Sequence, residues 1–582
     1  MPSARTPLLA EARPSSESQR SDDRAEEEDA ALHGQGTGRQ QSTRFTWSVR
    51  LRELILFIWA VVATAGVIVI AAWVQHDKQS VGSPPRSSSI PASKRNLIFM
   101  VSDGMGPASL SLTRSFRQLV EDIPINDTLS LDRHFWGTSR TRSSNSLVTD
   151  SAAGATAFSC GLKSYNGAIS MLPDLTPCGT VLEAAKRAGY HTGLVVTTDI
   201  TDATPACFAS HTEMRTQMDE IALQEIGEGP LGHIVDLMLG GGRCHFLANT
   251  SGAASCRQDD VDVAGLAQKR GYTYLDNRAG FDSLKMGKNV TLPMLGLFAH
   301  YNIPFELDRR NMADTYPSLS EMATTALHAL EAATKDSDKG FFLMIEGSRV
   351  DHAGHINDPA AQVREVLEYD KTFQLALDFV ESSQVEGVVV STSDHETGGL
   401  ATALQEPGHL PVYNWYPSFL ANAKASAEHL AILLRNHVDD AGKSGDLSSL
   451  NPEPLKNWIN TNLILNGLGI ADALDEELDE VVASSEDATT VFASILSLRA
   501  HIGWSTHGHS AVDVNIYSSG GEAAEQLHGN RENTDIGKFL REYLDVDVES
   551  ITAELNEKMP RKRFTEGLRV TDFEMERGQK LQ

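Results

Sequence analysis

Four largely apolar runs, each followed by an acidic residue, constrain the fold of this chain more than any other feature. They are Asn96–Ser102 before Asp103, His191–Thr198 before Asp199, Phe341–Ile345 before Glu346, and Gly387–Ser393 before Asp394 and His395. Runs rich in Val, Leu, Ile and Phe are typical of strands buried on both faces. Helix-like stretches such as Thr180–Ala188 and Ala360–Ser382 separate them. We therefore expect an α/β fold with a large, mostly parallel central sheet flanked by helices.

The polar residues at the ends of these runs predict a site. In open parallel sheets, ligands bind beyond the carboxyl ends of the strands. A single acidic residue after a strand is more often a turn former or a helix cap. Here Asp103, Glu346, Asp394 and His395 all repeat the same placement. The repetition favours a shared site over three unrelated turns.

The stretch Val148–Phe158 contains Asp150-Ser151-Ala152 among small residues, at the start of a helix-prone run. A serine at a helix N-terminus lies where unpaired backbone N–H groups favour negative charge. The simpler interpretation is that Ser151 is an ordinary N-cap residue. The alternative is that Ser151 is a nucleophile. The sequence of this stretch alone leaves both interpretations open.

A metal-ligating pattern follows the third strand run. Asp351 and His355 are four residues apart and share a face if this segment is helical, whereas His352 points elsewhere. Far downstream, either His507 or His509 can complete such a site. Carboxylate and imidazole ligands without thiolate suit zinc, and all-oxygen positions suit magnesium. Two zinc ions and a serine between them would suit phosphoryl transfer, with Ser151 as the nucleophile.

Charge and cysteine content narrow the class of protein. Lys and Arg total 50 and Asp and Glu total 78, for a formal net charge of −28 over 582 residues. This balance argues against a nucleic-acid partner, which requires a basic face. None of the five cysteines forms a CxxC pair. Cys244 and Cys256 can form a disulfide in an oxidising compartment, and the odd count leaves at least one thiol unpaired.

The N-terminal region predicts a membrane anchor. Residues 1–50 are polar and include an acidic cluster, so we expect a disordered cytosolic tail. Leu54–Gln75 carries no charge and is long enough to cross a bilayer as one transmembrane helix. Arginines precede it, which places the N-terminus in the cytosol and the rest in a lumen, as in a single-pass type II protein. A cleaved signal peptide is the alternative, disfavoured by the long hydrophilic segment before the run.

The remaining segments complete the predicted organisation. Residues 79–94 are a Ser/Pro-rich stalk, 95–545 are the catalytic domain, and 546–582 are a charged tail. Within the domain, 401–500 are predicted to be mainly helical and to form an insertion that covers one end of the sheet. Three N-x-S/T sequons lie after the apolar run, at Asn126, Asn249 and Asn289. They are candidate glycosylation sites on the lumenal side.

In this order, the motifs resemble those of the alkaline phosphatases, a metal-dependent family with a serine nucleophile. The similarity extends from about Leu97 to about Val514. The motifs are Asp103-Gly-Met-Gly, Thr149-Asp-Ser-Ala, Asp202-Ala-Thr-Pro, Arg215, Glu346-Gly, Asp351-x-x-x-His355, Asp394-His395 and His507-Gly. With its N-terminal anchor, the chain most resembles the vacuolar (repressible) alkaline phosphatases of fungi.

The resemblance implies a role for each matching residue. Ser151 forms a phosphoserine intermediate, and Arg215 binds the phosphate. The implied metals are two Zn²⁺ and one Mg²⁺ per chain. The zinc that binds substrate and activates water is held by Asp351, His355 and His507. The zinc that activates Ser151 is held by Asp103, Asp394 and His395. The magnesium is held by Asp103, Thr204 and Glu346.

The resemblance also implies hydrolysis of phosphate monoesters with broad specificity, a homodimer, and a location in the vacuole membrane with the catalytic domain in the lumen. The sequence mixes two patterns: His352 matches the animal enzymes, and Asp202 matches the enteric bacterial enzymes. A phosphodiesterase or pyrophosphatase of the same superfamily is the alternative activity. A non-catalytic binding protein is a third hypothesis, and it predicts broken metal ligands.

Overall fold

The computed structural model of this chain describes residues 94–406, 408–440, 452–484 and 488–559, together with 56–59, 62, 64 and 65. It separates into two compact units, Met1–Ser89 and Ile90–Gln582. The predicted tail 1–50, nearly all of the stalk 79–94 and most of the predicted span 54–75 lie outside the described residues. Among the residues that are described, none belongs to a helix with the length and apolar character needed to cross a membrane.

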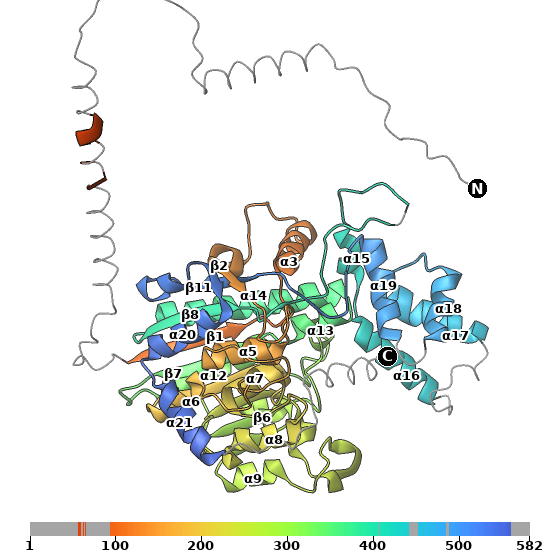
Figure 1. The fold of residues 1–582 in the computed structure, drawn as a ribbon. Coiled ribbons are helices and arrows are strands. Elements are labelled where there is room, and N and C mark those ends of the chain that lie inside the picture. The colour runs from red at the N-terminus through yellow and green to blue at the C-terminus, as the bar shows by residue number, and fades with distance from the viewer. Residues whose placement is uncertain are drawn as a thin grey trace, which may run out of the picture. The chain divides into compact units, whose positions relative to one another are not determined.

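The second unit is built on one ten-stranded sheet (Figure 1). From edge to edge its strands are β12 (Gly529–Glu532), β2 (Phe135–Arg140), β11 (Val514–Ser518), β8 (Glu386–Thr392), β1 (Arg95–Val101), β7 (Phe341–Glu346), β3 (His191–Asp199), β4 (Leu237–Gly241), β6 (Met294–Leu297) and β5 (Thr273–Leu275). Neighbouring strands pair in parallel, except that β11 is antiparallel to both β2 and β8. The prediction of a mostly parallel α/β sheet is confirmed.

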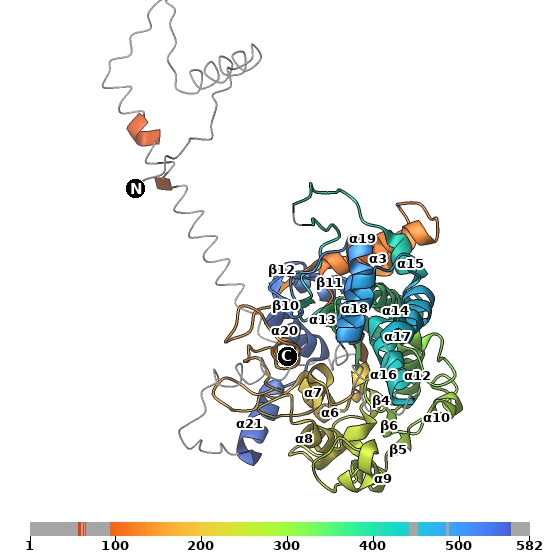
Figure 2. The same ribbon diagram turned by 90° about the vertical axis from the view of Figure 1, so that its right-hand side faces the viewer.

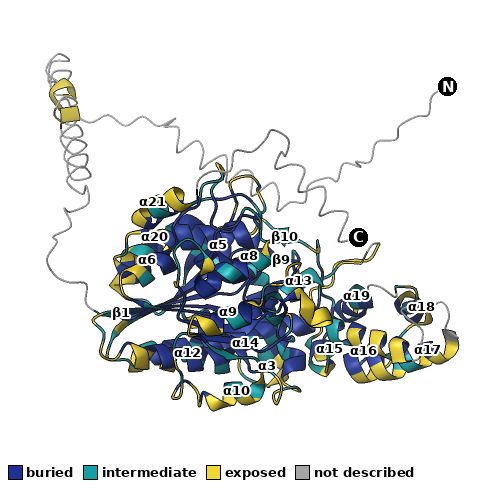
Figure 3. Ribbon diagram, turned by 90° about the horizontal axis from the view of Figure 1, so that it is seen from below, coloured by how far each residue is buried: buried dark blue, intermediate teal, exposed yellow. Residues whose placement is uncertain are grey.

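Helices cover both faces of the sheet, which explains why its central strands are apolar on both sides (Figure 3). Leu97, Phe99 and Val101 of β1 face one core, whereas Ile98 and Met100 face the other. The first core is closed by helices that include α5 (Ser151–Cys160), α6 (Val181–Arg187), α7 (Ala203–Ala209) and α20 (Asn533–Leu544). The second is closed mainly by α12 (Leu319–Ala333) and α14 (Pro359–Ser382).

Local sequence signals set the starts of these helices. Thr180 and Glu183 form a capping box at α6, and Ser318 and Glu321 form one at α12. At α14, the Asp358 side chain accepts hydrogen bonds from the first turn, and Pro359 occupies the first helical position.

Shorter elements connect the layers. They are α4 (Ser130–Arg133), α8 (Met218–Leu223), η1 (Gln224–Glu228), η2 (Arg243–Phe246), η3 (Asn249–Ala254), α9 (Val263–Lys269), α10 (Arg278–Ser283), α11 (Glu306–Arg309), α13 (Arg349–His355), β9 (Glu396–Thr397), β10 (His509–Ser510) and η6 (Glu522–Leu527).

The described part of the segment 401–500 is largely helical, as predicted, and its apolar side chains form a third core together with residues such as Phe116 and Val363 (Figures 1 and 2). Its helices are α15 (Pro417–Asn422), α16 (Ala427–Asp440), α17 (Pro452–Trp458), η5 (Ile459–Leu468), α18 (Asp475–Ala483) and α19 (Ala488–Ala500). This helical insertion packs on α3 (Pro107–Val120) and α14. It therefore adjoins the helix layer on one face of the sheet.

The charged tail was predicted to begin at residue 546, which is too early. Residues 548–558 form helix α21 (Val548–Lys558), which buries Val548, Ile551 and Leu555 against Ala184 of α6. The apolar residues recur at helical spacing among charged ones. The high charge content therefore led to an amphipathic helix being predicted as part of the tail. Residues 560–582 lie outside the described part of the chain.

Two disulfides join Cys160 to Cys178 and Cys244 to Cys256, and Cys207 is a buried free thiol. The second bridge was predicted as possible, and the first was not predicted. The side chains of Asn126, Asn249 and Asn289 are all exposed, so each sequon is accessible. Glycosylation at these positions stays a prediction.

A buried carboxyl group in η1 yields a prediction about stability. Glu225 is completely buried, and neither of its carboxylate oxygens has a hydrogen-bond partner among the described residues. Burial raises its pKa well above 4.5. Because the folded state holds this proton more tightly than the unfolded chain, stability present at acid pH is lost as pH rises through the raised pKa.

We expect Glu225→Gln to raise the free energy of unfolding near pH 8 by about 1–3 kcal/mol, because it removes an uncompensated charge at nearly constant volume. Urea unfolding near pH 5 and near pH 8 measures this, and the gain should shrink at the lower pH. Glu331→Gln, at an exposed position of α12, is the matched control. Identical unfolding midpoints for Glu225→Gln and the unaltered protein near pH 8 would contradict the account.

Candidate active site

The sheet brings the predicted strand-end residues to one edge. Strands β8, β1 and β7 are adjacent, and Val101 at the end of β1 is in register with Thr392 of β8 and Glu346 of β7. Asp103, Asp394 and His395 follow directly on these strands. They therefore emerge side by side at the carboxyl edge of the sheet, as the sequence predicts.

Asp103, Asp394 and His395 form the first group of potential ligands, with all three ligand atoms within 4.8 Å of one another. The Nε2 atom of His395 lies 3.2 Å from Asp394 Oδ2 and 3.6 Å from Asp103 Oδ1. Both of these oxygens are buried, and neither has a hydrogen-bond partner among the described residues. Buried acceptors that lack donors fit a cation held at this point.

The electrostatics of this group agree with that interpretation. Burial and the neighbouring carboxylates, chiefly Asp394, raise the pKa of Asp103 well above its usual value. Burial, reinforced by Asp351, raises the pKa of Asp394 to about 7. Burial lowers the pKa of His395, which keeps the imidazole neutral and able to ligate a metal. A bound cation would offset the cost of burying these carboxylates together.

The second group joins helix α13 to strand β10. Asp351 and His355 share a face of α13, as their spacing predicts, and His355 Nε2 lies 3.3 Å from Asp351 Oδ2. His509 Nε2 lies 3.1 Å from His355 Nε2 and 3.6 Å from Asp351 Oδ1. The rings of His509 and His395 stack with centroids 3.5 Å apart, so the two groups adjoin.

The placement of His507 corrects the predicted ligand set. The structure places His509, and not His507, in the position that was predicted for His507. His507 Nδ1 is 2.8 Å from the backbone carbonyl of His355, and His355 Nδ1 is hydrogen-bonded to the carbonyl of His507. This reciprocal pair holds the His507 ring beside the backbone of His355. His509 is two residues further along a strand, where it faces the ligand group.

The third predicted group, Asp103, Thr204 and Glu346, lies between β1, β7 and the start of α7. The hydroxyl of Thr204 is buried and has no hydrogen-bond partner among the described residues. Ser348 Oγ donates to Glu346 Oε2 at 2.6 Å. Burial, with a contribution from Asp202, raises the pKa of Glu346 to about 8. An all-oxygen donor set of this kind fits magnesium.

The structure excludes the interpretation of Ser151 as the N-cap of its helix. Asp150 is the N-cap of α5, and its Oδ1 accepts a hydrogen bond from Ala153 N at 3.0 Å. Ser151 is therefore the first helical residue, and its hydroxyl is not used as the cap. Instead, Ser151 Oγ lies 3.1 Å from His395 Nε2. Its side chain is directed into the first ligand group, at a helix N-terminus.

Small residues in α5 permit this approach. A Cβ atom added to Gly154 would lie 2.9 Å from Asp394 Cβ, so a larger residue there would push the helix away from the strand end. The small residues of this helix therefore allow it to lie close to the strand end that carries Asp394.

Arg215 lies beside Asp150, the residue before Ser151, and is held in place by two carboxylates. Its Nη2 is 2.8 Å from Asp202 Oδ1, and its Nη1 is 3.5 Å from Asp150 Oδ2. Burial by itself lowers the pKa of Arg215, but Asp202 and Asp150 raise it above its usual value. The guanidinium is therefore always charged and is oriented by the residue that precedes Ser151. Such a planar donor suits a tetrahedral anion.

Two further residues contribute to the site although no role was predicted for them. Thr397 Oγ1 is hydrogen-bonded to Asp351 Oδ1 and lies 3.2 Å from His395 Nδ1, so it links the two ligand groups. Asp202 caps α7 and positions Arg215. Their proximity in sequence to Asp394-His395 and to Thr204 was the available signal, but neither contact follows from sequence spacing.

Comparison with known proteins agrees with this arrangement. The family model described as alkaline phosphatase matches residues 94–546. The repressible alkaline phosphatase of Saccharomyces cerevisiae is 53% identical over 478 residues, covering 79% of this chain and 83% of that protein. Thermus thermophilus alkaline phosphatase has a solved structure with a TM-score of 0.65 and 26% identity, covering 81% of this chain and 99% of that one. A variant of the alkaline phosphatase from the bacterium TAB5, solved with Mg bound in its M3 site, has a TM-score of 0.53 and 25% identity, covering 78% of this chain and 99% of that one. The chain therefore belongs to the alkaline phosphatase family, whose metal-dependent members hydrolyse phosphate monoesters.

Proposed function

We propose that this protein hydrolyses phosphate monoesters, with broad specificity, through a phosphoserine intermediate on Ser151. The observation that carries the proposal is the position of Ser151 Oγ, 3.1 Å from His395 Nε2 and at a helix N-terminus. The hydroxyl is thus free of a capping role and lies within a group of unpaired buried ligands. A structural N-cap serine would have its oxygen on the backbone of its own helix.

We propose two zinc sites and one magnesium site. The first zinc would be held by Asp351, His355 and His509, and the second by Asp103, Asp394 and His395. Asp103, Thr204 and Glu346 would hold the magnesium. The unpartnered atoms Asp103 Oδ1, Asp394 Oδ2 and Thr204 Oγ1 support this assignment. When bound, such cations neutralise phosphoryl oxygens and lower the pKa of a bound hydroxyl or water.

The residues of the chain have distinct roles in the reaction. Arg215, fixed by Asp202 and Asp150, binds two phosphoryl oxygens and presents phosphorus to Ser151. Ser151 Oγ loses its proton and forms a bond to phosphorus, while the bond from phosphorus to the alcohol oxygen breaks and the alcohol leaves with a proton. Water then attacks the phosphoserine, which releases inorganic phosphate and regenerates the Ser151 hydroxyl. Thr397 orients Asp351 and His395 throughout.

A comparison of substrates tests this activity. We expect p-nitrophenyl phosphate to be turned over at least about 10²-fold faster than bis(p-nitrophenyl) phosphate, because a monoester presents three free phosphoryl oxygens to Arg215 and the proposed cations together, whereas a diester presents only two. Chelation of metals should abolish both activities, and zinc with magnesium should restore them. A faster diester reaction would favour a phosphodiesterase of the same superfamily. Full monoesterase activity in metal-free protein would contradict the assignment of the three groups.

We further propose a type II membrane protein whose catalytic domain lies in the lumen of the vacuole. The uncharged run Leu54–Gln75 and the two disulfides, which require an oxidising compartment, support this topology. A homodimer is also proposed. Leu410 and Tyr413, in the segment 401–500, are 86% and 95% exposed and would offer apolar contacts to a second copy of the chain.

A further inference from the structure

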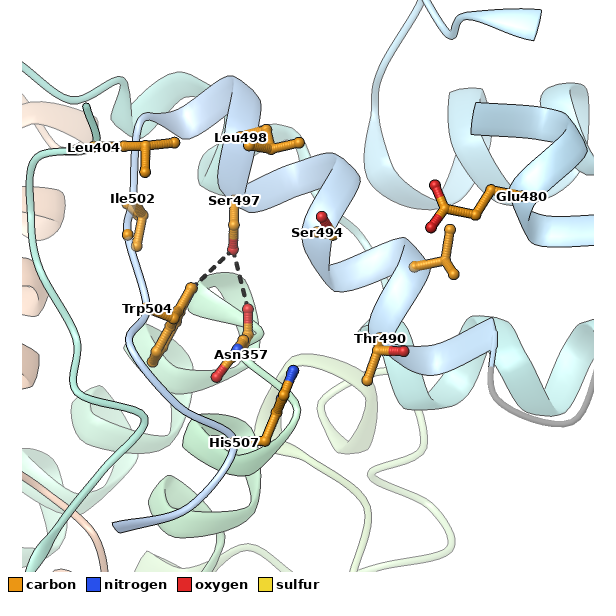
Figure 4. A pocket seen from close by; sticks show the side chains of 12 residues that line it. Asn357, Leu404, Glu480, Thr490, Ser494, Ser497, Leu498, Ile502, Trp504 and His507 are labelled. Carbon is orange, nitrogen blue, oxygen red and sulfur yellow. Dashed lines mark hydrogen bonds between the residues drawn. The ribbon is translucent and has the colours of Figure 1, made fainter. Parts of the chain in front are cut away.

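A groove of about 380 Å³ lies beside the candidate active site, between helix α19 and the segment that leads to His509 (Figure 4). Its walls come from the helical insertion on one side and from residues 502–507 on the other. His507, which the ligand set does not use, stands at one end of it. The groove therefore adjoins the site at His507.

A continuous series of contacts connects the groove to the nucleophile. Ser151 Oγ is 3.1 Å from His395, whose ring stacks on His509 at 3.5 Å. His509 is 3.1 Å from His355, and the His355 carbonyl is 2.8 Å from His507 Nδ1. In phosphoryl transfer the leaving oxygen lies roughly opposite the attacking oxygen. An alcohol displaced by Ser151 would therefore leave on the side of His509 and His355, where the His355 backbone contacts His507 at the end of the groove.

The groove is held in shape by partly buried contacts. Trp504 Nε1 donates to Ser497 Oγ at 3.0 Å, and Ser497 Oγ donates to the carbonyl of Asn357 at 3.0 Å (Figure 4). Trp504 also packs so closely on Gly398 that a Cβ atom there would lie 2.5 Å from its ring. Gly398 directly follows the Asp394–Thr397 segment. The groove wall therefore packs against the same backbone segment that carries ligand residues.

The lining of the groove defines what it can bind. Leu498, which is 49% exposed although α19 is otherwise largely buried, gives the groove most of its apolar surface, and the buried side chains of Val491 and Ile502 also line it. Ser494 adds a hydroxyl at the surface. Among the described lining residues, Glu480 is the one acidic side chain, and no Lys or Arg is present. The groove thus favours an apolar group with a cationic end and disfavours an anionic one.

We propose that this groove is the leaving-group subsite, and that it selects phosphate monoesters of alcohols with an apolar body and an amine end. The inference rests on the proposed function, since it assigns the alcohol released by Ser151 to the groove. Leu498 and Ile502 would cover the apolar body, and Glu480 would pair with the ammonium group. The subsite raises kcat/KM for such esters without contacting the phosphoryl group.

Two matched substrates test the subsite on the intact protein: aryl phosphates with the same para alkyl chain, ending in an amine or in a carboxylate. Each kcat/KM is divided by that for p-nitrophenyl phosphate measured with the same variant. We expect the amine ester to be preferred about five-fold, as for a partly exposed ion pair. Glu480→Lys should abolish or invert this preference. Ser494→Trp should lower the relative kcat/KM of both long esters by about ten-fold, because it fills the groove.

Glu476→Lys is the matched control, since Glu476 lies one turn earlier on α18, is exposed and does not line the groove. It should keep the preference of the unaltered protein. An unchanged preference in Glu480→Lys, with p-nitrophenyl phosphate still hydrolysed, would overturn the subsite and leave the proposed function standing. Failure of the unaltered protein to hydrolyse p-nitrophenyl phosphate would overturn the proposed function and the subsite with it.

Discussion

Replacing Ser151 by alanine should lower kcat for p-nitrophenyl phosphate by roughly 10³-fold or more, because loss of a covalent nucleophile removes the main reaction path. The substitution deletes one oxygen from the first residue of α5 and leaves the Asp150 cap in place. We therefore expect thermal stability and bound metal to stay close to those of the unaltered protein. Steady-state kinetics, thermal unfolding and metal analysis of the same preparation measure all three.

Ser159→Ala is the matched control for this experiment. Ser159 lies on the same helix, is equally buried, and forms its hydrogen bonds with neighbours outside the ligand groups. We expect it to keep kcat within a few-fold of the unaltered value. If Ser151→Ala retained full activity with its metals bound, the hydroxyl would be a structural group and another residue or water would be the nucleophile.

Replacing His509 by alanine should remove about one zinc per chain and lower kcat/KM by roughly 10²-fold or more, because the second ligand group loses an imidazole. The expectation follows from the distances between His509 Nε2, His355 Nε2 and Asp351 Oδ1, which are 3.1 and 3.6 Å. Metal content after dialysis against metal-free buffer is the primary measurement. It separates loss of a ligand from a general loss of activity.

His507→Ala provides the contrast. Its side chain contacts the carbonyl of His355 and lines the groove, so its removal should leave the zinc content unchanged. The two residues are separated only by Gly508, have the same chemistry, and differ in which part of His355 they contact: His509 contacts the imidazole and His507 the backbone carbonyl. If His507→Ala lost zinc and His509→Ala did not, the ligand set predicted from the sequence motif would be correct and the geometric assignment wrong.

The central sheet was predictable because its strands are buried on both faces. Leu97 to Val101 alternate between two cores, so the whole run is apolar and ends where polar residues begin. The same logic predicted that Asp103, Glu346 and Asp394 converge, since carboxyl ends of adjacent parallel strands meet at one edge. The pair Asp351 and His355 was predictable from helical spacing alone.

Other features depend on contacts between segments far apart in the chain. The choice between His507 and His509 is made by a hydrogen bond to the backbone of His355, 152 residues away in sequence. The role of Thr397 is set by its contact with Asp351, and that of Asp202 by its contact with Arg215. Whether Ser151 caps its helix depended on a neighbour with the same ability, Asp150, whose carboxylate takes the cap. Sequence spacing alone does not show which of two nearby residues with the same ability takes such a role.

The overall negative charge of the molecule also bears on how the candidate site binds an anionic substrate. A chain with a formal net charge of −28 repels anions in general, and the candidate site itself gathers buried carboxylates. Binding of a phosphate ester in such surroundings requires concentrated positive charge. Arg215 supplies part of it, held between Asp150 and Asp202. The proposed metals supply the rest, which explains why chelation should abolish the reaction completely.

The most direct test of the central claim is to trap the covalent intermediate. The protein is mixed with a phosphate monoester, quenched in acid within the first turnovers, digested and analysed by mass spectrometry. We predict a phosphoryl group on the peptide that contains Ser151, assigned to Ser151 by fragmentation and absent from the Ser151→Ala variant. A phosphoryl group on a different residue, or no phosphorylated peptide at any quench time or pH while substrate is consumed, would contradict the account.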